Sequence, residues 1–385
     1  MIGDANPPRE SGKSLTVGLI VNPSAGMGGA VGLKGTDGPE VLARAIALGA
    51  TPVACARARL ALQAMATSHA RLRVAPAPGP LGQQSAAGLG LDVHVLGAAP
   101  AGPTTPADTR AAVQAMRERG VDLILFAGGD GTARDVVEEI GLAVPVLGIP
   151  SGVKMHSGVF ATSPEAAGRL IAELSREPRR FSCREVEIMD VDEDAVRSNR
   201  IATRLYGYAR VPSAPRLVQA AKSGPPPSGE AAVDAACAEI AAGMAPGTLY
   251  LIGPGRTAMR VMEALRLEGT LLGVDAVLDR RLVGRDLSEA EILELMRGRR
   301  TQIVLGVIGG QGFVLGRGNQ QVGPRVIRQV GRDGLVIVAS AEKLLALPEP
   351  RLLVDTGDPD LDATLAGHVR VRTGPRRSMV MRLEP

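Results

Sequence analysis

The sequence predicts an α/β fold, with a doubly wound, mostly parallel sheet in the N-terminal half and a second, β-rich α+β domain in the C-terminal half. Apolar runs alternate with amphipathic runs from residue 15 to about residue 175, which is typical of parallel strands joined by helices. Beyond residue 181 the apolar segments become short, which is typical of a β-rich domain. Glycine-rich turns follow two of the early apolar runs, and open α/β sheets bind ligands at such strand ends.

The first domain is expected over residues 14–175, after a polar leader at 1–13. Its first buried strand is Leu15 to Val21, where seven residues in a row are apolar, Thr or Gly. The same patterns predict further strands at 71–75, 91–96, 121–127 and 145–150, and helices at 39–48, 56–70, 106–120 and 134–140.

The second domain is expected over residues 176–385. Proline and glycine keep the stretch from Lys222 to Glu230 out of regular structure, so a loop is predicted there. Strands are predicted at 183–189, 201–211, 248–252, 302–308, 335–339 and 352–354, and helices at 231–242 and 288–297.

Composition narrows the class of protein. The 385 residues are 45% hydrophobic, enough to bury the cores of two domains. The 44 basic residues exceed the 40 acidic ones only slightly, no dense basic run occurs and aromatic residues make up 2%, so nucleic acid is not an expected partner. Because no stretch has the roughly 18 to 20 apolar residues of a membrane helix, no membrane association is expected either.

Cysteine usage predicts the compartment. Cys55, Cys183 and Cys237 lie far apart without a Cys-x-x-Cys pair. The spacing supports neither a disulfide framework nor a structural zinc site, so a reducing cytoplasm is expected.

The turn at 128–132 reads Gly-Gly-Asp-Gly-Thr and lies between a predicted strand and a predicted helix. Its glycines allow backbone N–H groups to approach a phosphate, while Asp130 projects into the same space. An aspartate at a helix start would repel a phosphate unless a metal ion or a substrate proton were involved. The pattern therefore favours phosphoryl transfer to a hydroxyl over a turn that only connects two elements.

This motif resembles the signature shared by NAD kinases, diacylglycerol and sphingosine kinases and, more loosely, 6-phosphofructokinases. The segment from Pro145 to Ala161 contains Gly-Ile-Pro-Ser-Gly-Val-Lys-Met-His-Ser and resembles the ATP-NAD kinase/AcoX-like branch. The resemblance covers most of the chain from Val17 onward. It implies a kinase of NAD kinase and diacylglycerol kinase-like fold, whose C-terminal domain completes the active-site cleft.

The resemblance also implies chemistry. Asp130 would act on the accepting hydroxyl, as proton acceptor or orienting group, and the phosphates of the donor would be held by Gly128, Gly129, Gly131 and Thr132. The implied reaction is magnesium-dependent transfer from ATP, or from polyphosphate, to the 2′-hydroxyl of NAD to give NADP. A homo-oligomer is expected, with Mg²⁺ arriving with ATP.

Two alternatives stay open. Ordinary NAD kinases differ from this chain between Gly152 and Ser157, which leaves a kinase of another small-molecule alcohol as a second interpretation. A non-catalytic nucleotide-binding regulator would keep the glycines and tolerate loss of Asp130, so the presence of Asp130 favours an enzyme.

A second glycine-rich turn follows the first strand. It matches neither the dinucleotide-binding Gly-x-Gly-x-x-Gly pattern nor a Walker A motif, because position 31 is Val and Lys34 stands outside any Gly-Lys pair. Both a nucleotide-binding and a structural interpretation remain. The nucleotide-binding candidates here are Asn22, Gly26, Gly28 and Gly29, and Lys34 and Asp37 are second-rank candidates.

The segment after Pro150 offers a cation, an imidazole and a hydroxyl in four positions. Lys154 is predicted to neutralise charge on the migrating phosphoryl group. His156 and Ser157 are candidates for nucleotide binding, although a lone histidine is as often a hydrogen-bonded structural residue.

Two further segments are candidate ligand sites in the second domain. The turn from Gly253 to Met259 repeats the strand, glycine turn and helix arrangement that binds anions, and it resembles in form the Gly-Ser-Thr-Ala turn of NAD kinases. The loop at 309–321 combines glycines with amide and guanidinium groups that suit a polar ligand, rather than a plain sheet corner. The candidates are Gly255, Arg256 and Thr257 in the turn, and Gln311, Arg317 and Asn319 in an exposed loop.

Three aspartates at strand ends are weak candidates for metal ligands. Asp275, Asp355 and Asp358 could each hold a magnesium ion through water or cap a turn. Their spacing does not form a recognisable metal-binding motif.

Overall fold

The computed structural model describes residues 14–33, 35, 38–67, 72–153, 155–176, 182–191, 203–214, 217–219 and 229–385. The chain divides into two compact units. The first unit contains the described residues up to Gly26, those from Thr51 to Val191 and those from 203 to 219. The second unit contains the described residues of Met27–Ala50 and all those from 229 onward.

The first unit is built on a five-stranded parallel sheet with the order β3-β2-β1-β4-β5. All of β1 except Thr16 is buried, since apolar side chains or glycine face both layers of helices. The strands are β1 (Leu15–Val21), β2 (Leu72–Pro76), β3 (Asp92–Val93), β4 (Leu123–Gly128) and β5 (Val146–Pro150).

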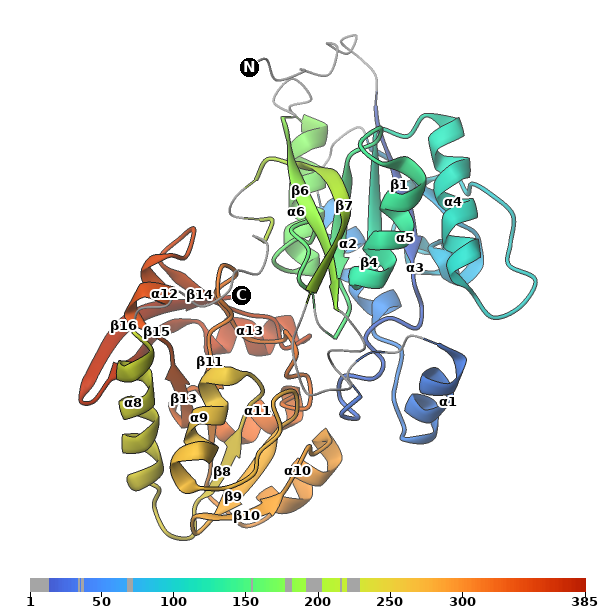
Figure 1. The fold of residues 1–385 in the computed structure, drawn as a ribbon. Coiled ribbons are helices and arrows are strands. Elements are labelled where there is room, and N and C mark those ends of the chain that lie inside the picture. Colours follow the sequence, from blue (N-terminus) through green and yellow to red (C-terminus); the bar gives the residue numbers. More distant parts are fainter. Residues whose placement is uncertain are drawn as a thin grey trace. The chain divides into compact units, whose positions relative to one another are not determined.

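Two helix pairs cover this sheet. Helix α2 packs with α6, and α4 packs with α5, as Figure 1 shows for the latter pair. Helix α4 begins at a capping box formed by Thr105 and Asp108 and ends at Gly120 in the left-handed conformation. The helices are α2 (Ala54–Ala66), η1 (Gly79–Leu81), α3 (Gln83–Ala86), α4 (Pro106–Arg119), α5 (Asp130–Ile140) and α6 (Pro164–Arg176).

An antiparallel hairpin of β6 (Cys183–Val191) and β7 (Thr203–Pro212) also belongs to the first unit. Val186, Ile188, Ala209 and Val211 point into the same core as the parallel sheet. The sequence predicts these strands in a second domain that starts at residue 176. The structure places them with the first unit, because these four alternating apolar residues pack into its core.

The second unit is built on a nine-stranded mixed sheet with the order β10-β9-β8-β11-β13-β15-β16-β14-β12. Its strands are β8 (Leu249–Ile252), β9 (Asp275–Leu278), β10 (Arg281–Gly284), β11 (Thr301–Gly306), β12 (Phe313–Leu315), β13 (Leu335–Val338), β14 (Arg351–Val354), β15 (Gly367–Gly374) and β16 (Arg377–Glu384). Its later helices are α8 (Glu230–Ala242), α9 (Arg256–Leu265), α10 (Glu289–Met296), α11 (Pro324–Val330), η3 (Arg332–Gly334), α12 (Ala341–Leu345) and α13 (Pro359–Leu365).

Helix α1 (Pro39–Ala47) lies in the second unit although it follows β1 in the chain. The segment before α1 also belongs to the second unit. Its Ala30 carbonyl accepts a hydrogen bond from the Glu289 N–H over 2.9 Å. A Cβ at Gly29 would lie 2.9 Å from the Gln320 side chain, so the segment packs closely on a residue that comes 291 positions later. The chain therefore enters the second unit after β1, returns to the first unit and then leaves it again.

The predicted fold class is confirmed: a parallel sheet in the first unit and a mixed, strand-rich sheet in the second. Two local expectations differ from the structure. The helix predicted at 134–140 begins four residues earlier, at Asp130, and the strand predicted at 91–96 shrinks to Asp92–Val93. None of the helices in the described residues is long and apolar enough to cross a membrane.

Cys237 gives a testable consequence of this packing. The thiol lies in the core of the second unit, and burial raises its pKa to about 12. Because only the thiolate is nucleophilic, Cys237 should resist alkylation at pH 8 in the folded protein and react quickly in urea. Mass spectrometry of alkylated peptides over time measures this difference. Equal labelling rates with and without urea would show that this core opens readily.

Candidate active site

The loops after β1 and β4 meet at the point where the strand order of the parallel sheet reverses. From β1 the chain continues to β2 on one side, and from β4 it continues to β5 on the other. The Asn22 N–H donates to the Ala127 carbonyl over 2.9 Å, and Asn22 Nδ2 donates to Thr132 Oγ1 over 3.0 Å. This is the position at which open α/β sheets bind their ligands. Asn22, predicted from the turn after the first strand, is thus brought together with Gly128 and Thr132, predicted from the motif at 128–132.

Glycines allow three loops to approach one another at this sheet edge. Gly26 has a φ of 79°, and a Cβ there would lie 2.0 Å from the Ser151 carbonyl oxygen. A Cβ at Gly152 would lie 2.6 Å from the Gly129 Cα, so the loops after β4 and β5 touch backbone to backbone. A Cβ at Gly128 would meet Thr132 at 2.4 Å. Larger residues at these positions would push the loops apart.

Asp130 lies at the first position of α5 and is buried, with 4% of its surface exposed. Its Oδ2 accepts from the His156 N–H over 2.7 Å and lies 3.2 Å from His156 Nδ1. Its Oδ1 accepts from the Ser157 N–H over 3.1 Å and from Ser157 Oγ over 2.6 Å. Since a helix N-terminus favours negative charge, both the helix and the loop after β5 stabilise this carboxylate.

The loop that holds Asp130 is itself supported by the hairpin. Ser157 Oγ accepts from the Met189 N–H over 3.0 Å and lies 2.9 Å from the Met189 carbonyl. One hydroxyl proton serves either that carbonyl or Asp130, and the shorter contact with the carboxylate favours Asp130. Gln219 Nε2 donates to the Ser157 carbonyl over 3.0 Å. Positioning of Asp130 therefore depends on β6 and on Gln219.

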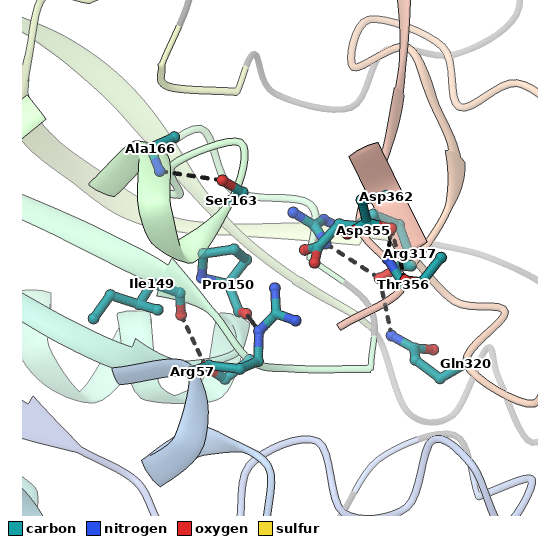
Figure 2. A network of polar contacts seen from close by, with 12 residues as sticks. Arg57, Ile149, Pro150, Ser163, Ala166, Arg317, Gln320, Asp355, Thr356 and Asp362 are labelled. Atoms are coloured by element: carbon teal, nitrogen blue, oxygen red, sulfur yellow. Dashed lines mark hydrogen bonds and ion pairs between the residues drawn. The ribbon is translucent and has the colours of Figure 1, made fainter. Parts of the chain in front are cut away.

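Three residues near this edge of the parallel sheet belong to none of the sequence motifs described above. Arg57 on α2 donates to the Pro150 carbonyl at the end of β5, a contact drawn in Figure 2. Met189 acts through its backbone, and Gln219 is a buried amide outside regular structure. Sequence reasoning missed all three. Only the hydrophobic alternation of the hairpin, which places one face against the first core, could have indicated that residues near 189 reach the site.

Three cationic or acidic candidates, Lys34, Asp37 and Lys154, lie outside the described residues. Gly131 lies in the first turn of α5, between Asp130 and Thr132. Gly28 and Gly29 are buried and belong to the second unit, where a Cβ at Gly28 would meet the Gly35 carbonyl at 2.6 Å.

The turn after β8 has the predicted arrangement of strand, glycine turn and helix start. Gly255, with a φ of 105°, precedes the first residue of α9, and no side chain caps that helix. Arg256 is exposed and Thr257 is partly exposed. These residues therefore keep the geometry expected of an anion-binding turn within the second unit.

The sequence predicts an exposed, ligand-binding loop at 309–321, but in the structure the polar side chains of this loop are buried. Gln311, Arg317 and Asn319 are each at least 94% buried. Asn319 Oδ1 accepts from the Gly316 N–H over 2.8 Å, and its Nδ2 donates to the Val314 carbonyl over 2.8 Å. Arg317 forms an ion pair of 2.5 Å with Asp355 (Figure 2). It also stacks on Phe313, with Cζ 4.0 Å from the ring centroid. The expectation of exposure was wrong, because these polar side chains shape their own loop.

The aspartates considered as metal ligands all have protein partners. Asp275 accepts from the Thr270 N–H, Thr270 Oγ1 and the Asp286 N–H, at 2.6 to 2.9 Å. Asp355 pairs with Arg317, and Asp358 caps α13 and pairs with Arg328. Within the described part of the chain no group of three or more His, Cys, Asp or Glu could hold a metal ion. These residues do not fit a protein-held magnesium site.

Comparison with known proteins identifies the family. Residues 17–178 match the ATP-NAD kinase N-terminal domain, and residues 247–383 match the ATP-NAD kinase C-terminal domain. No curated protein and no solved structure showed significant similarity to the chain. The two matches cover most of the chain and include the site around Asp130. The chain belongs to the ATP-NAD kinase family and is a phosphotransferase with an alcohol group as acceptor.

Proposed function

We propose that the protein transfers a phosphoryl group from ATP, or from polyphosphate, to the 2′-hydroxyl of NAD to give NADP. Membership of the ATP-NAD kinase family supports this substrate pair. The AcoX-like segment at 148–157 supports a specialised branch of that family.

One observation carries the proposal: a buried carboxylate lies at the reversal point of a parallel sheet, on the first turn of a helix. Asp130 lies where the loops after β1, β4 and β5 converge, which is where a nucleotide would bind. Four hydrogen bonds from residues 156 and 157 fix its position. A group fixed in this way contributes to catalysis by orientation as well as by charge.

The phosphates of the donor would be bound by backbone rather than by a metal cage. The first turn of α5 has no side-chain cap, so its N–H groups suit a phosphate oxygen. Magnesium would arrive as the complex with ATP, since Mg²⁺ commonly binds through substrate phosphates and water.

A direct assay tests the proposal. Purified protein is incubated with NAD and either magnesium-ATP or polyphosphate, and NADP is measured with an NADP-specific dehydrogenase. We expect NADP to form with at least one donor, in proportion to protein concentration. Absence of NADP with both donors would contradict the choice of NAD as acceptor.

A second candidate is a kinase of another small-molecule alcohol. The segment from Gly152 to Ser157, which departs from the sequence of ordinary NAD kinases, favours this alternative because two of its residues, His156 and Ser157, donate hydrogen bonds to Asp130. A panel of alcohols with labelled ATP distinguishes the two. Phosphorylation of another alcohol, with none of NAD, would support the second candidate.

Lys154 is proposed as the cation that neutralises charge on the transferred phosphoryl group. Replacing Lys154 with Met keeps the length of the side chain and removes its charge. Because the charge develops in the transition state, kcat should fall by about 10²–10³ while KM for ATP changes little. Single-turnover kinetics measure the chemical step. An unchanged single-turnover rate in Lys154→Met would remove Lys154 from the mechanism.

The cytoplasmic location and the homo-oligomer are also proposals. Widely spaced cysteines support the reducing compartment. Light scattering of the purified chain measures its oligomeric state.

A further inference from the structure

We propose that a clamp around one arginine of α5 positions Asp130 for the reaction. The clamp consists of Arg134 on α5, Asp190 on β6 and Tyr206 on β7. This inference rests on the proposed phosphoryl transfer, and it extends the support of Asp130 to residues outside the sequence motifs. Arg134 is a positioning residue, because it acts on Asp130 through the helix and the hairpin rather than on the substrate.

The first argument is the geometry of α5. Asp130 and Arg134 are four positions apart, and residues at that spacing lie one above the other on the same face of a helix. The hairpin of β6 and β7 packs against α5, and Figure 1 shows it beside this helix. A contact that holds Arg134 against the hairpin therefore fixes the rotation of α5, and with it the direction of the Asp130 carboxylate.

The second argument is that β6 reaches Asp130 by two routes. Arg134 Nη1 lies 3.1 Å from Asp190 Oδ2. The residue before Asp190, Met189, donates its N–H to Ser157 Oγ over 3.0 Å, and that hydroxyl lies 2.6 Å from Asp130 Oδ1. The contacts thus close a ring, in which β6 supports Asp130 through Ser157 on one side and through Arg134 on the other. A side chain supported from two sides keeps one orientation better than a side chain held by its helix alone.

The third argument is a β-bulge at the position of Tyr206. The pairing of β6 with β7 shifts between Ile188 and Met189, and Tyr206 is the extra residue of β7 at this shift. Bulges redirect a side chain and are frequent beside active sites. The guanidinium carbon of Arg134 lies 5.3 Å from the centroid of the Tyr206 ring, and that of Arg204 lies 5.5 Å from it. The bulge therefore places an aromatic ring against the arginine that pairs with β6.

The surroundings of Arg134 also predict what its loss would change. Burial acts against its charge, yet the pKa of the guanidinium is raised, because Asp190, Asp135 and a hydrogen bond with Tyr206 favour the charged form. The side chain of Arg134 is 41% exposed and that of Asp190 is 21% exposed, so the ion pair contributes little to the free energy of unfolding. Removal of the pair should therefore disturb the alignment of Asp130 more than the stability of the fold.

The kinetic test compares two ion pairs of α5. Arg134→Met keeps the length of the side chain and removes its charge. We expect kcat to fall about tenfold, less than the roughly 10²-fold that a displacement of about 1 Å can cost, while KM for ATP and the melting temperature change little. Arg110→Met is the matched control, because Arg110 on α4 pairs with Asp135 of α5 over the same 3.1 Å. Its kcat should equal that of the wild type.

Two further variants show whether the contact itself is responsible. Arg134→Lys retains a cation that can reach Asp190, so its kcat should lie between those of Arg134→Met and the wild type. Arg134→Met combined with Asp190→Asn should lose no more kcat than Arg134→Met alone, because both substitutions break one contact. Asp190→Asn, which keeps the shape of the side chain, takes the place of Arg134→Met if that variant does not fold.

Amide hydrogen exchange tests the positioning without any reaction. The backbone N–H groups of His156 and Ser157 donate to the Asp130 carboxylate over 2.7 and 3.1 Å. When Asp130 loses its fixed orientation, these two amides open more often. We expect NMR to show faster exchange at both amides in Arg134→Met than in the wild type, and no change in Arg110→Met.

The outcomes separate this inference from the proposed function. Wild-type kcat and wild-type exchange in Arg134→Met would overturn the clamp. An equal loss of kcat in Arg110→Met would overturn it too, since any weakened ion pair of α5 would then have the same effect. A fall in kcat without faster exchange would mean that Arg134 does not act through Asp130. If the wild type phosphorylates no alcohol but the two amides still exchange faster in Arg134→Met, the proposed function fails and the positioning of Asp130 is confirmed.

Discussion

Turnover of Asp130→Asn falls by about 10²–10⁴ relative to the wild type, while the affinity for ATP changes little. The substitution keeps the shape of the side chain but places an N–H group against donors from His156 or Ser157. The loop after β5 then loses its fixed position, and the group that acts on the hydroxyl is no longer aligned. Steady-state kinetics give kcat, and calorimetric titration gives the affinity for ATP.

A matched control separates catalysis from folding. Asp135 is buried on the same helix and pairs with Arg110 at 3.1 Å. Asp135→Asn should lower the melting temperature without changing kcat. If Asp130→Asn retains near-normal turnover, Asp130 has no part in the reaction.

Arg317→Ala lowers the free energy of unfolding of the second unit by about 3–5 kcal/mol, because it leaves the buried carboxylate of Asp355 without its ion-pair partner. The two side chains are 2% and 3% exposed. The loss of unfolding free energy is measured in a urea titration, in which the extent of alkylation of Cys237 reports the unfolding of the same unit. From the sequence alone, Arg317 was expected in an exposed loop, where its replacement would lower the stability only modestly. Its burial in the structure predicts the larger loss.

Two variants control for the effect of charge alone. Arg297 pairs with Glu294 on the surface, so Arg297→Ala should cost less than about 1 kcal/mol. Replacing both members of the buried pair, as Arg317→Met with Asp355→Leu, should be less harmful than Arg317→Ala, since no buried charge then lacks a partner. A loss in Arg317→Ala no larger than in Arg297→Ala would contradict the assignment of a buried ion pair.

Much of the fold was predictable because periodicity reports on local burial. Leu15 to Val21 and Leu123 to Gly128 are nearly continuous apolar runs, as central parallel strands require, and both are strands. The start of α5 was less predictable. Gly129 and Gly131 are poor helix formers, yet Asp130 begins the helix, because close contact with Gly152 requires glycine and fixes the turn.

Part of the candidate site was predictable because its central residues lie in two short sequence motifs. The motif at 128–132 and the segment at 148–157 each indicated function, and the structure joins them through Asp130, His156 and Ser157. The support from Met189 and Gln219 depends on contacts between residues 32 to 62 positions apart. Arg317 was misread for the same reason, because its partner Asp355 comes 38 positions later.

The position of the segment from Met27 to Ala50 in the chain determines which of the two units can complete its folding first during synthesis. It belongs to the second unit, but it leaves the ribosome before nearly all of the first unit has been made. Ala30 accepts a hydrogen bond from Glu289, 259 residues later, and at about 5–20 residues per second that interval is about 13–50 s. The parallel sheet of the first unit can therefore form while the segment from Met27 to Ala50, which lies between β1 and the rest of that unit in the chain, still lacks the residues of the second unit that it packs against. During this time the segment from Met27 to Ala50, which includes α1, has no second unit to pack against.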